Sequence, residues 1–199
     1  GDDLIVGAAG ADVINGQGGV DTVSYADVTG VSSHGQAGVI GMAVNLSGES
    51  VSDATIQNNM GLATAVTGNS DPRAVLATDT AQYLINTAAG SVKSLAYDVD
   101  TLTSIEGVIG SALNDYIVLG ADASIVDAGA GADVVFSGTA VDNISGGAGD
   151  DVINIGSASD HAAGETITGG DGTDTIRFNS VLGETLVLSA NVTGVETAQ

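Results

Sequence analysis

A nine-residue period runs through two parts of this chain and limits what it can fold into. Written in nines, one block covers residues 1–24 and a second covers residues 110–177, where five extra residues interrupt the frame. In the second block the eighth place of all seven units is Val or Ile, and the sixth place is acidic in six of the seven. A unit this short accommodates one strand and one tight turn, so it must stack on copies of itself to bury a core.

The two columns predict different roles within the stack. The eighth-place residue is β-branched and should point inward, forming a ladder of Val and Ile. The glycines should occupy turn positions with positive φ, and the acidic residue should lie in the turn, on the outside. The sixth places hold Asp3, Asp12 and Asp21 in the first block and Asp115, Ser124, Asp133, Asp142, Asp151, Glu165 and Asp174 in the second.

Composition narrows the classes of function that remain. The 199 residues include 3 Lys and Arg against 25 Asp and Glu, a formal charge of −22, while 43% of residues are apolar. The apolar fraction is too high for a disordered acidic tail, and the charge disfavours nucleic acid and anionic membranes as partners. The chain has no Cys, which excludes disulfides, and no apolar run long enough to span a bilayer. Because its first residue is Gly, we expect a piece of a longer protein.

The acidic column itself predicts a bound cation. Stacked turns place like-charged carboxylates about one strand spacing, roughly 4.8 Å, apart, where they repel one another unless a cation lies between them. The available ligands are carboxylate and backbone carbonyl oxygens, because the two histidines, His34 and His161, do not stand at metal-binding spacing. Oxygen-only ligation from a Gly-rich turn favours Ca²⁺, with Mg²⁺ as second choice.

Several units resemble a known repeat. AGAGADVVF, GGAGDDVIN and GGDGTDTIR are similar to the RTX, or haemolysin-type calcium-binding, nonapeptide GGxGxDxUx, and residues 100–111 resemble the lead-in such arrays often have. The resemblance implies an all-β fold, a right-handed parallel β-roll or β-helix solenoid with a non-repeat insert, in which Ca²⁺ lies between equivalent turns of successive coils. It also implies type I secretion of the unfolded chain, folding on external calcium, and an extracellular location at the bacterial cell surface.

The two sides of the implied roll are unequal. The units that start at residues 110, 128, 146 and 169 share one side and three of them are close to the consensus, whereas the units on the other side lack the glycine at the fourth place. We therefore expect about three Ca²⁺ along the first side and few or none along the other. The resemblance assigns carboxylate ligands to Asp133, Asp151 and Asp174, and carbonyl ligands to Gly129, Gly131, Gly147, Gly149, Gly170 and Gly172.

Four further acidic residues are weaker candidates. Asp115 departs from the pattern because Leu113 replaces a glycine. Asp3 and Asp21 share a side and could hold one more ion, whereas Asp12 has no mate on its side within this chain.

The remaining segments do not follow the nine-residue frame. Residues 25–109 form an insert, which we expect to continue or flank the solenoid; residues 39–51 read as one or two strands, and residues 73–87 as a short helix or a strand. Residues 178–199 are expected to continue the strands, because residues 184–196 alternate apolar and polar side chains.

The sequence offers no catalytic constellation. Ser24, Asp27 and His34 read as polar loop residues and His161 as a lone surface histidine, and neither GxSxG nor HExxH occurs. The first hypothesis is therefore not an enzyme but a calcium-folded structural module of a large surface protein, such as an S-layer protein or adhesin. Its partners would be calcium ions, and beyond these other copies of itself or a cell-surface glycan or lipopolysaccharide. The alternative is the export-and-folding domain of a secreted protease, lipase or glycan-active enzyme. A third hypothesis, glycan binding by the insert, is disfavoured by the scarcity of aromatic residues.

Overall fold

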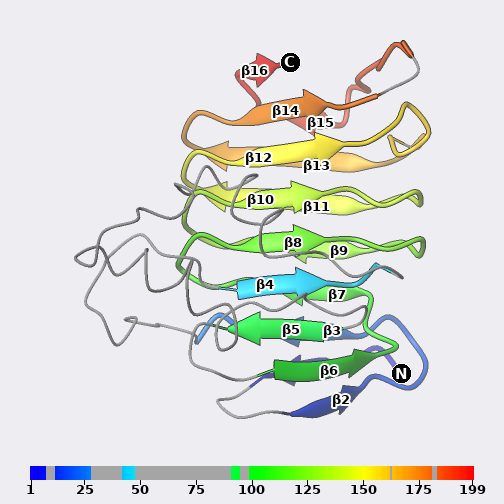
Figure 1. The fold of residues 1–199 in the computed structure, drawn as a ribbon, viewed down its shortest axis with the longest axis vertical. Coiled ribbons are helices and arrows are strands. Elements are labelled where there is room, and N and C mark those ends of the chain that lie inside the picture. Colours follow the sequence, from blue (N-terminus) through cyan, green and yellow to red (C-terminus); the bar gives the residue numbers. More distant parts are fainter. Residues whose placement is uncertain (8–11, 28–41, 48–90, 95–98, 162, 181–182) are drawn as a thin grey trace, which may run out of the picture.

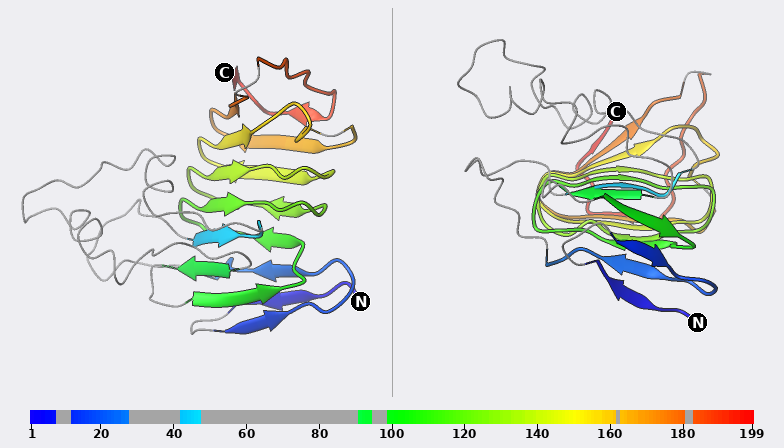
Figure 2. Two further views of the ribbon diagram at one scale, coloured as in Figure 1. Left: turned by 45° about the vertical axis from the view of Figure 1, so that its right-hand side comes forward. Right: turned by 60° about the horizontal axis from the view of Figure 1, so that its bottom comes forward.

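The chain folds into two β-sheets whose strands stack into a flattened coil (Figure 1). The computed structural model describes residues 1–7, 12–27, 42–47, 91–94, 99–161, 163–180 and 183–199, and the described residues contain strands and turns but no helix. Consecutive strands of the repeat blocks alternate between the sheets, so each pair of nine-residue units completes one coil (Figure 2). The predicted all-β parallel roll is thereby confirmed.

The two sheets have different strand orders. Sheet A contains, in spatial order, β1 (Leu4–Val6), β3 (Thr22–Ser24), β7 (Gly107–Ile109), β9 (Ile125–Asp127), β11 (Asn143–Ala148), β13 (Thr166–Asp171) and β15 (Val192–Thr193). Sheet B contains β2 (Val13–Asn15), β6 (Val99–Thr103), β5 (Ser91–Ser94), β4 (Met42–Asn45), β8 (Tyr116–Val118), β10 (Val134–Phe136), β12 (Val152–Ile155), β14 (Thr175–Phe178) and β16 (Thr197–Ala198).

The strands pair in the register that the repeat predicts. Val135 lies opposite Ile117, and Ile144 lies opposite Val126, each partner being 18 residues, or two units, earlier. The offset becomes 23 where Ile153 pairs with Ile176, because five extra residues enter the frame between them. A parallel strand pair leaves the eighth-place side chains of all coils on the same face of a sheet.

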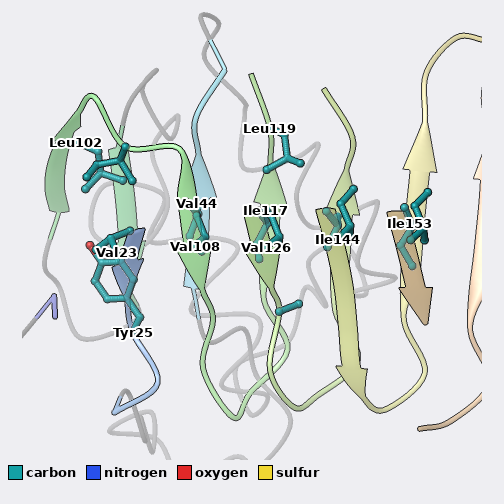
Figure 3. Close-up of a cluster of buried hydrophobic side chains, with 14 of the residues drawn as sticks. Val23, Tyr25, Val44, Leu102, Val108, Ile117, Leu119, Val126, Ile144 and Ile153 are labelled. Atoms are coloured by element: carbon teal, nitrogen blue, oxygen red, sulfur yellow. The ribbon is translucent and has the colours of Figure 1, made fainter. Parts of the chain in front are cut away.

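The eighth-place residues form the core between the sheets. Val23, Ile144 and Ile167 of sheet A and Ile117, Val135, Ile153 and Ile176 of sheet B are all 0% exposed, as is Val108, which lies outside the nine-residue frame. Figure 3 shows part of this core. Each fully buried Val or Ile contributes roughly 1.5–3 kcal/mol relative to its exposed state. The predicted aliphatic ladder is confirmed and forms one continuous cluster along the stack.

Three strands from residues 25–109 enter sheet B. β4 runs parallel to β8, β6 runs parallel to β2, and β5 lies between them antiparallel to both. β4 falls inside the segment 39–51 expected to form strand, whereas residues 73–87 and His34 lie outside the described residues. Sheet B thus passes continuously from the first repeat block to the second.

One expectation about the ends of the array needs correction. Residues 183–191 contain no strand, although they alternate apolar and polar side chains; Leu186 packs against the core, but Val187 is 77% exposed and most of the stretch faces solvent. Only β15 and β16 resume the two sheets. At the other end, β2 pairs with β6 and Ile14 lies opposite Leu102; the expectation that Asp12 has no acidic mate on its side stays a prediction.

Candidate metal centre

The acidic residues lie in two rows of turns, one along each edge of the roll. We call the turns that lead into sheet A the A row and those that lead into sheet B the B row. The sixth-place residues of the A row are Asp3, Asp21, Ser124, Asp142 and Glu165, and those of the B row are Asp12, Asp115, Asp133, Asp151 and Asp174. The near-consensus units of the second block therefore all belong to the B row, and Asp3 and Asp21 belong to the A row.

Most of the sixth-place carboxylates are buried, which corrects the expectation that they lie outside. Asp21, Asp115, Asp133 and Asp174 are 0% exposed and Asp151 is 1% exposed. For Asp21, Asp133, Asp151 and Asp174 the cause is a hydrogen bond between coils, in which the side chain accepts from the backbone N–H of the sixth-place residue one coil earlier. In the B row the donors and acceptors are Asp115 N and Asp133 Oδ1 at 2.7 Å, Asp133 N and Asp151 Oδ1 at 2.8 Å, and Asp151 N and Asp174 Oδ1 at 2.9 Å. A turn amide that would otherwise be buried unpaired is satisfied in this way.

The second oxygen of several of these carboxylates has no hydrogen-bond donor. Among the described residues, the Oδ2 atoms of Asp21, Asp133, Asp151 and Asp174 are buried without a hydrogen-bond partner. A buried anionic oxygen is strongly unfavourable unless donors or a cation compensate its charge. The four orphaned oxygens therefore fit a cation, and three of them belong to the residues that the resemblance assigned as ligands.

Burial and mutual repulsion raise the pKa of these carboxyls. Burial raises the pKa of Asp133 to about 8, with the charges of Asp115 and Asp151 adding to the rise while the Asp115 N–H opposes it. Burial also raises the pKa of Asp151 to about 6, supported by the charge of Asp174. The pKa of Asp174 is raised by the same cause, with the charge of Glu196 adding to it. Without a cation, the row favours protonated carboxyls.

The turn glycines leave a small space beside each carboxylate. Gly146 and Gly169 stand at the first place of their units, and a Cβ on either would overlap the Oδ2 of its own acidic residue, Asp151 or Asp174. The same Cβ would overlap a backbone carbonyl of the following coil, the oxygen of Gly169 for the first and of Gly194 for the second. One carboxylate oxygen and one carbonyl oxygen of adjacent coils thus border the same space, a hard-oxygen environment suited to Ca²⁺.

The six glycines expected to donate carbonyls all have the positive φ that the turn requires. The φ angles are 104° and 131° for Gly129 and Gly131, 108° and 133° for Gly147 and Gly149, and 125° and 138° for Gly170 and Gly172. Their backbones stack closely, since Ala148 N donates to Gly129 O at 3.0 Å. Residues with a side chain rarely adopt these φ values, and here the backbone of the preceding coil leaves no room for a Cβ.

Two acidic residues of the rows differ from the others, because hydrogen-bond donors occupy both of their carboxylate oxygens. Asp142 accepts from Ser124 N through Oδ1 at 2.8 Å and from Gly138 N through Oδ2 at 3.0 Å. Asp115 accepts from Ser111 N at 2.6 Å and from Ser111 Oγ at 2.9 Å. These two carboxylates hold the turn backbone directly, consistent with the departures of their units from the consensus.

The other candidates are less enclosed. Asp3 is exposed, although its N–H donates to Asp21 Oδ1 at 2.8 Å, and Asp12 is half-buried. In the described part of the chain no three acidic or histidine side chains converge on one point. A cation in these rows would therefore be held by two carboxylates together with backbone carbonyls.

His161 is not the lone surface histidine that the sequence suggested. Its side chain is 4% exposed, its Nδ1 lies 2.9 Å from Glu165 Oε2, and its Nε2 accepts from Ser189 N at 3.2 Å. Since Nε2 accepts, Nδ1 carries the proton and donates to the carboxylate. Burial lowers the pKa of His161, which keeps the ring neutral. Through these two hydrogen bonds, His161 connects Ser189 of the C-terminal segment to Glu165 of the A row.

Sequence reasoning missed two glutamates that take the place of the repeat aspartate. Glu106 Oε2 accepts from Asp21 N at 2.9 Å, and Glu196 Oε2 accepts from Asp174 N at 2.8 Å. Their spacing is the signal that could have found them. Glu106 stands two residues before Val108, which pairs with the eighth-place residue Val23, and Glu196 stands two residues before Ala198, which pairs with the eighth-place residue Ile176.

The raised pKa values predict how the metal-free chain responds to pH. A carboxyl with a raised folded-state pKa stabilises the fold below its unfolded value, near 3.8 for Asp133 and Asp151, and this stability is lost as pH rises through about 6 and about 8. We expect the calcium-depleted chain to show more strand signal in circular dichroism at pH 5 than at pH 8.5. Equal or greater strand signal at pH 8.5 would contradict the burial of these charges.

The comparisons agree with this geometry. The family model described as RTX calcium-binding nonapeptide repeat (4 copies) matches residues 1–27, 109–143, 138–162 and 163–180. Comparison with curated proteins gives no significant match. Within the described ranges no helix has the length and apolar character needed to cross a membrane.

Proposed function

Since this chain belongs to the RTX calcium-binding repeat proteins, we propose that Ca²⁺ ions bound along its turn rows hold the roll together as a structural module of a bacterial cell-surface protein. RTX nonapeptide repeats bind Ca²⁺, and RTX domains typically belong to secreted proteins. The observation that carries the assignment of sites is the succession of buried, unpartnered Oδ2 atoms on Asp133, Asp151 and Asp174.

In this proposal the B row is the main calcium row. Asp133, Asp151 and Asp174 provide carboxylates, and the stacked turn glycines provide carbonyls. Asp115 contributes less, because Ser111 already occupies its oxygens. In the A row, Asp21 is the principal ligand, with Asp3 beside it. In the B row, Asp12 directly precedes β2, the strand that pairs with β6. Without calcium the neighbouring charges repel, so the binding free energy of the ions is also folding free energy.

We place the module in an S-layer protein or adhesin, where other copies of the chain or a surface glycan or lipopolysaccharide would be the partner. Support comes from the strongly acidic, Cys-free sequence and from the absence of GxSxG and HExxH motifs in it. The sequence of the parent polypeptide on either side tests this placement. Further long repeats support it, whereas an adjoining protease or lipase motif would assign the module to a secreted enzyme.

Two isosteric substitutions test the calcium row. Asp133→Asn removes a charge from the row, so we expect fewer bound ions and at least about tenfold weaker calcium binding by calorimetry, since even outer-shell changes cost 10–100-fold at metal sites. Asp142→Asn is the matched control, because its carboxylate oxygens already accept from Ser124 and Gly138. The control should keep the wild-type number of ions. An unchanged stoichiometry and affinity in Asp133→Asn would remove Asp133 from the site.

A further inference from the structure

Two turns depart from the nonapeptide in the same way, one in each row. Three residues connect β6 to β7 and β15 to β16, whereas six connect β8 to β9. In both short turns an apolar residue, Ile105 or Val195, packs against the core and is followed by a glutamate in the place of the repeat aspartate.

The two glutamate turns make the same hydrogen bonds. Glu106 N and Gly107 N both donate to Asp21 O, at 3.0 and 2.8 Å, and Glu196 N and Thr197 N both donate to Asp174 O, at 3.1 Å each. In an ordinary turn the sixth-place N–H instead donates forward to the carboxylate of the next coil. In the glutamate turns that N–H points back to the previous coil. The chain of carboxylate–amide bonds therefore ends at each glutamate.

Each glutamate turn faces a buried carboxylate oxygen that has no donor. Asp21 and Asp174 are 0% exposed, and their Oδ2 atoms are unpartnered. A Cβ on Gly16 would overlap both Asp21 Oδ2 and the carbonyl oxygen of Ser104, which precedes Ile105 in the short turn. At Gly169 the corresponding atoms are Asp174 Oδ2 and the carbonyl oxygen of Gly194. The free oxygen thus faces the following turn, which is the turn that carries the glutamate.

We propose that Glu106 and Glu196 each complete a terminal calcium site, with Asp21 in the A row and with Asp174 in the B row. Each site combines the aspartate Oδ2, a carbonyl oxygen of the short turn and the glutamate carboxylate, an oxygen set of the kind that Ca²⁺ prefers. Glutamate replaces aspartate because the short turn requires a longer side chain to reach the previous coil. This assignment rests on the proposed function, calcium binding by the two rows, and adds Glu106 and Glu196 as ligands at the end of each run of carboxylate–amide bonds.

Calcium counting by calorimetry on the whole chain tests the proposal. Glu106→Gln and Glu196→Gln should each bind one ion fewer than the wild type, and the double variant two fewer. Glu184→Gln is the control, because Glu184 accepts from Ala158 N and Ser180 Oγ outside both rows, and it should keep the wild-type number. Circular dichroism at saturating calcium verifies that each variant is folded.

The outcomes separate this inference from the proposed function. A wild-type chain that binds no calcium overturns both. A wild-type chain that binds calcium, with Gln variants that keep its full number of ions, overturns only the terminal sites. Glu196 is exposed and lies in the last coil, so Glu196→Gln should fold even where Glu106→Gln does not. In that case the number of calcium ions bound by Glu196→Gln alone tests the terminal sites.

Discussion

Removing calcium from this chain should convert most of the roll into unordered polypeptide, and millimolar Ca²⁺ should restore it. The buried aspartates set the scale of the effect. Raising the pKa of Asp133 from 3.8 to about 8 corresponds to a cost on the order of 5 kcal/mol for its charged form. The whole stability of a domain is typically about 5–15 kcal/mol. The cost at Asp133, together with the smaller one at Asp151 in the next coil, is comparable to that whole stability, so we expect the metal-free chain to unfold at neutral pH.

The measurement is the strand signal in far-ultraviolet circular dichroism during a calcium titration. We expect little strand signal with excess chelator and a cooperative rise as calcium is added. Mg²⁺ at the same concentration should be much less effective, because it demands a stricter octahedral shell and retains its waters. Added NaCl should not substitute, since salt screens buried charges poorly. Identical spectra with chelator and with calcium would show that the roll does not depend on the ion.

The repeat made the core predictable from sequence. Each coil contacts only its neighbours, so a fixed period in the chain translates directly into a fixed offset between paired strands. Ile117 and Val135 could therefore be placed in contact from their spacing alone, and so could Ile153 and Ile176 once the five extra residues were recognised. No comparable rule exists for β5, whose antiparallel position in sheet B follows no period.

The direction of the acidic side chains could not be predicted in the same way. Hydrophilicity places an aspartate in solvent, but in the stack an amide of the preceding coil lacks a partner, and the Asp133 carboxylate turns inward to accept from Asp115 N. The repeat does not predict the roles of Glu106 and Glu196, because their turns are three residues shorter than a turn of the nine-residue unit. The alternation of apolar and polar residues in the tail predicted a strand that residues 183–191 do not form, because most of their side chains are exposed and only Leu186 packs against the core.

A single methyl group at Gly149 should destabilise the calcium-bound roll by several kcal/mol. Gly149 has a φ of 133°, and a Cβ there would overlap the carbonyl oxygen of Gly131 in the preceding coil. Adopting such a φ costs a residue with a side chain about 1–3 kcal/mol. The overlap adds to this cost, because a backbone oxygen held in the stack cannot rotate away. The altered turn also carries Asp151, so Gly149→Ala should raise the calcium concentration needed for folding.

Gly18→Ala is the matched control for this prediction. Gly18 lies in a turn of the first block, has no positive φ, and has no atom within 4 Å of the position its Cβ would take. Its substitution should change stability by no more than about 0.5 kcal/mol. Urea denaturation at saturating calcium compares the two variants through their midpoints. If Gly149→Ala unfolds at the same urea concentration as the control, the tight stacking of successive turns is not what holds the calcium row in register.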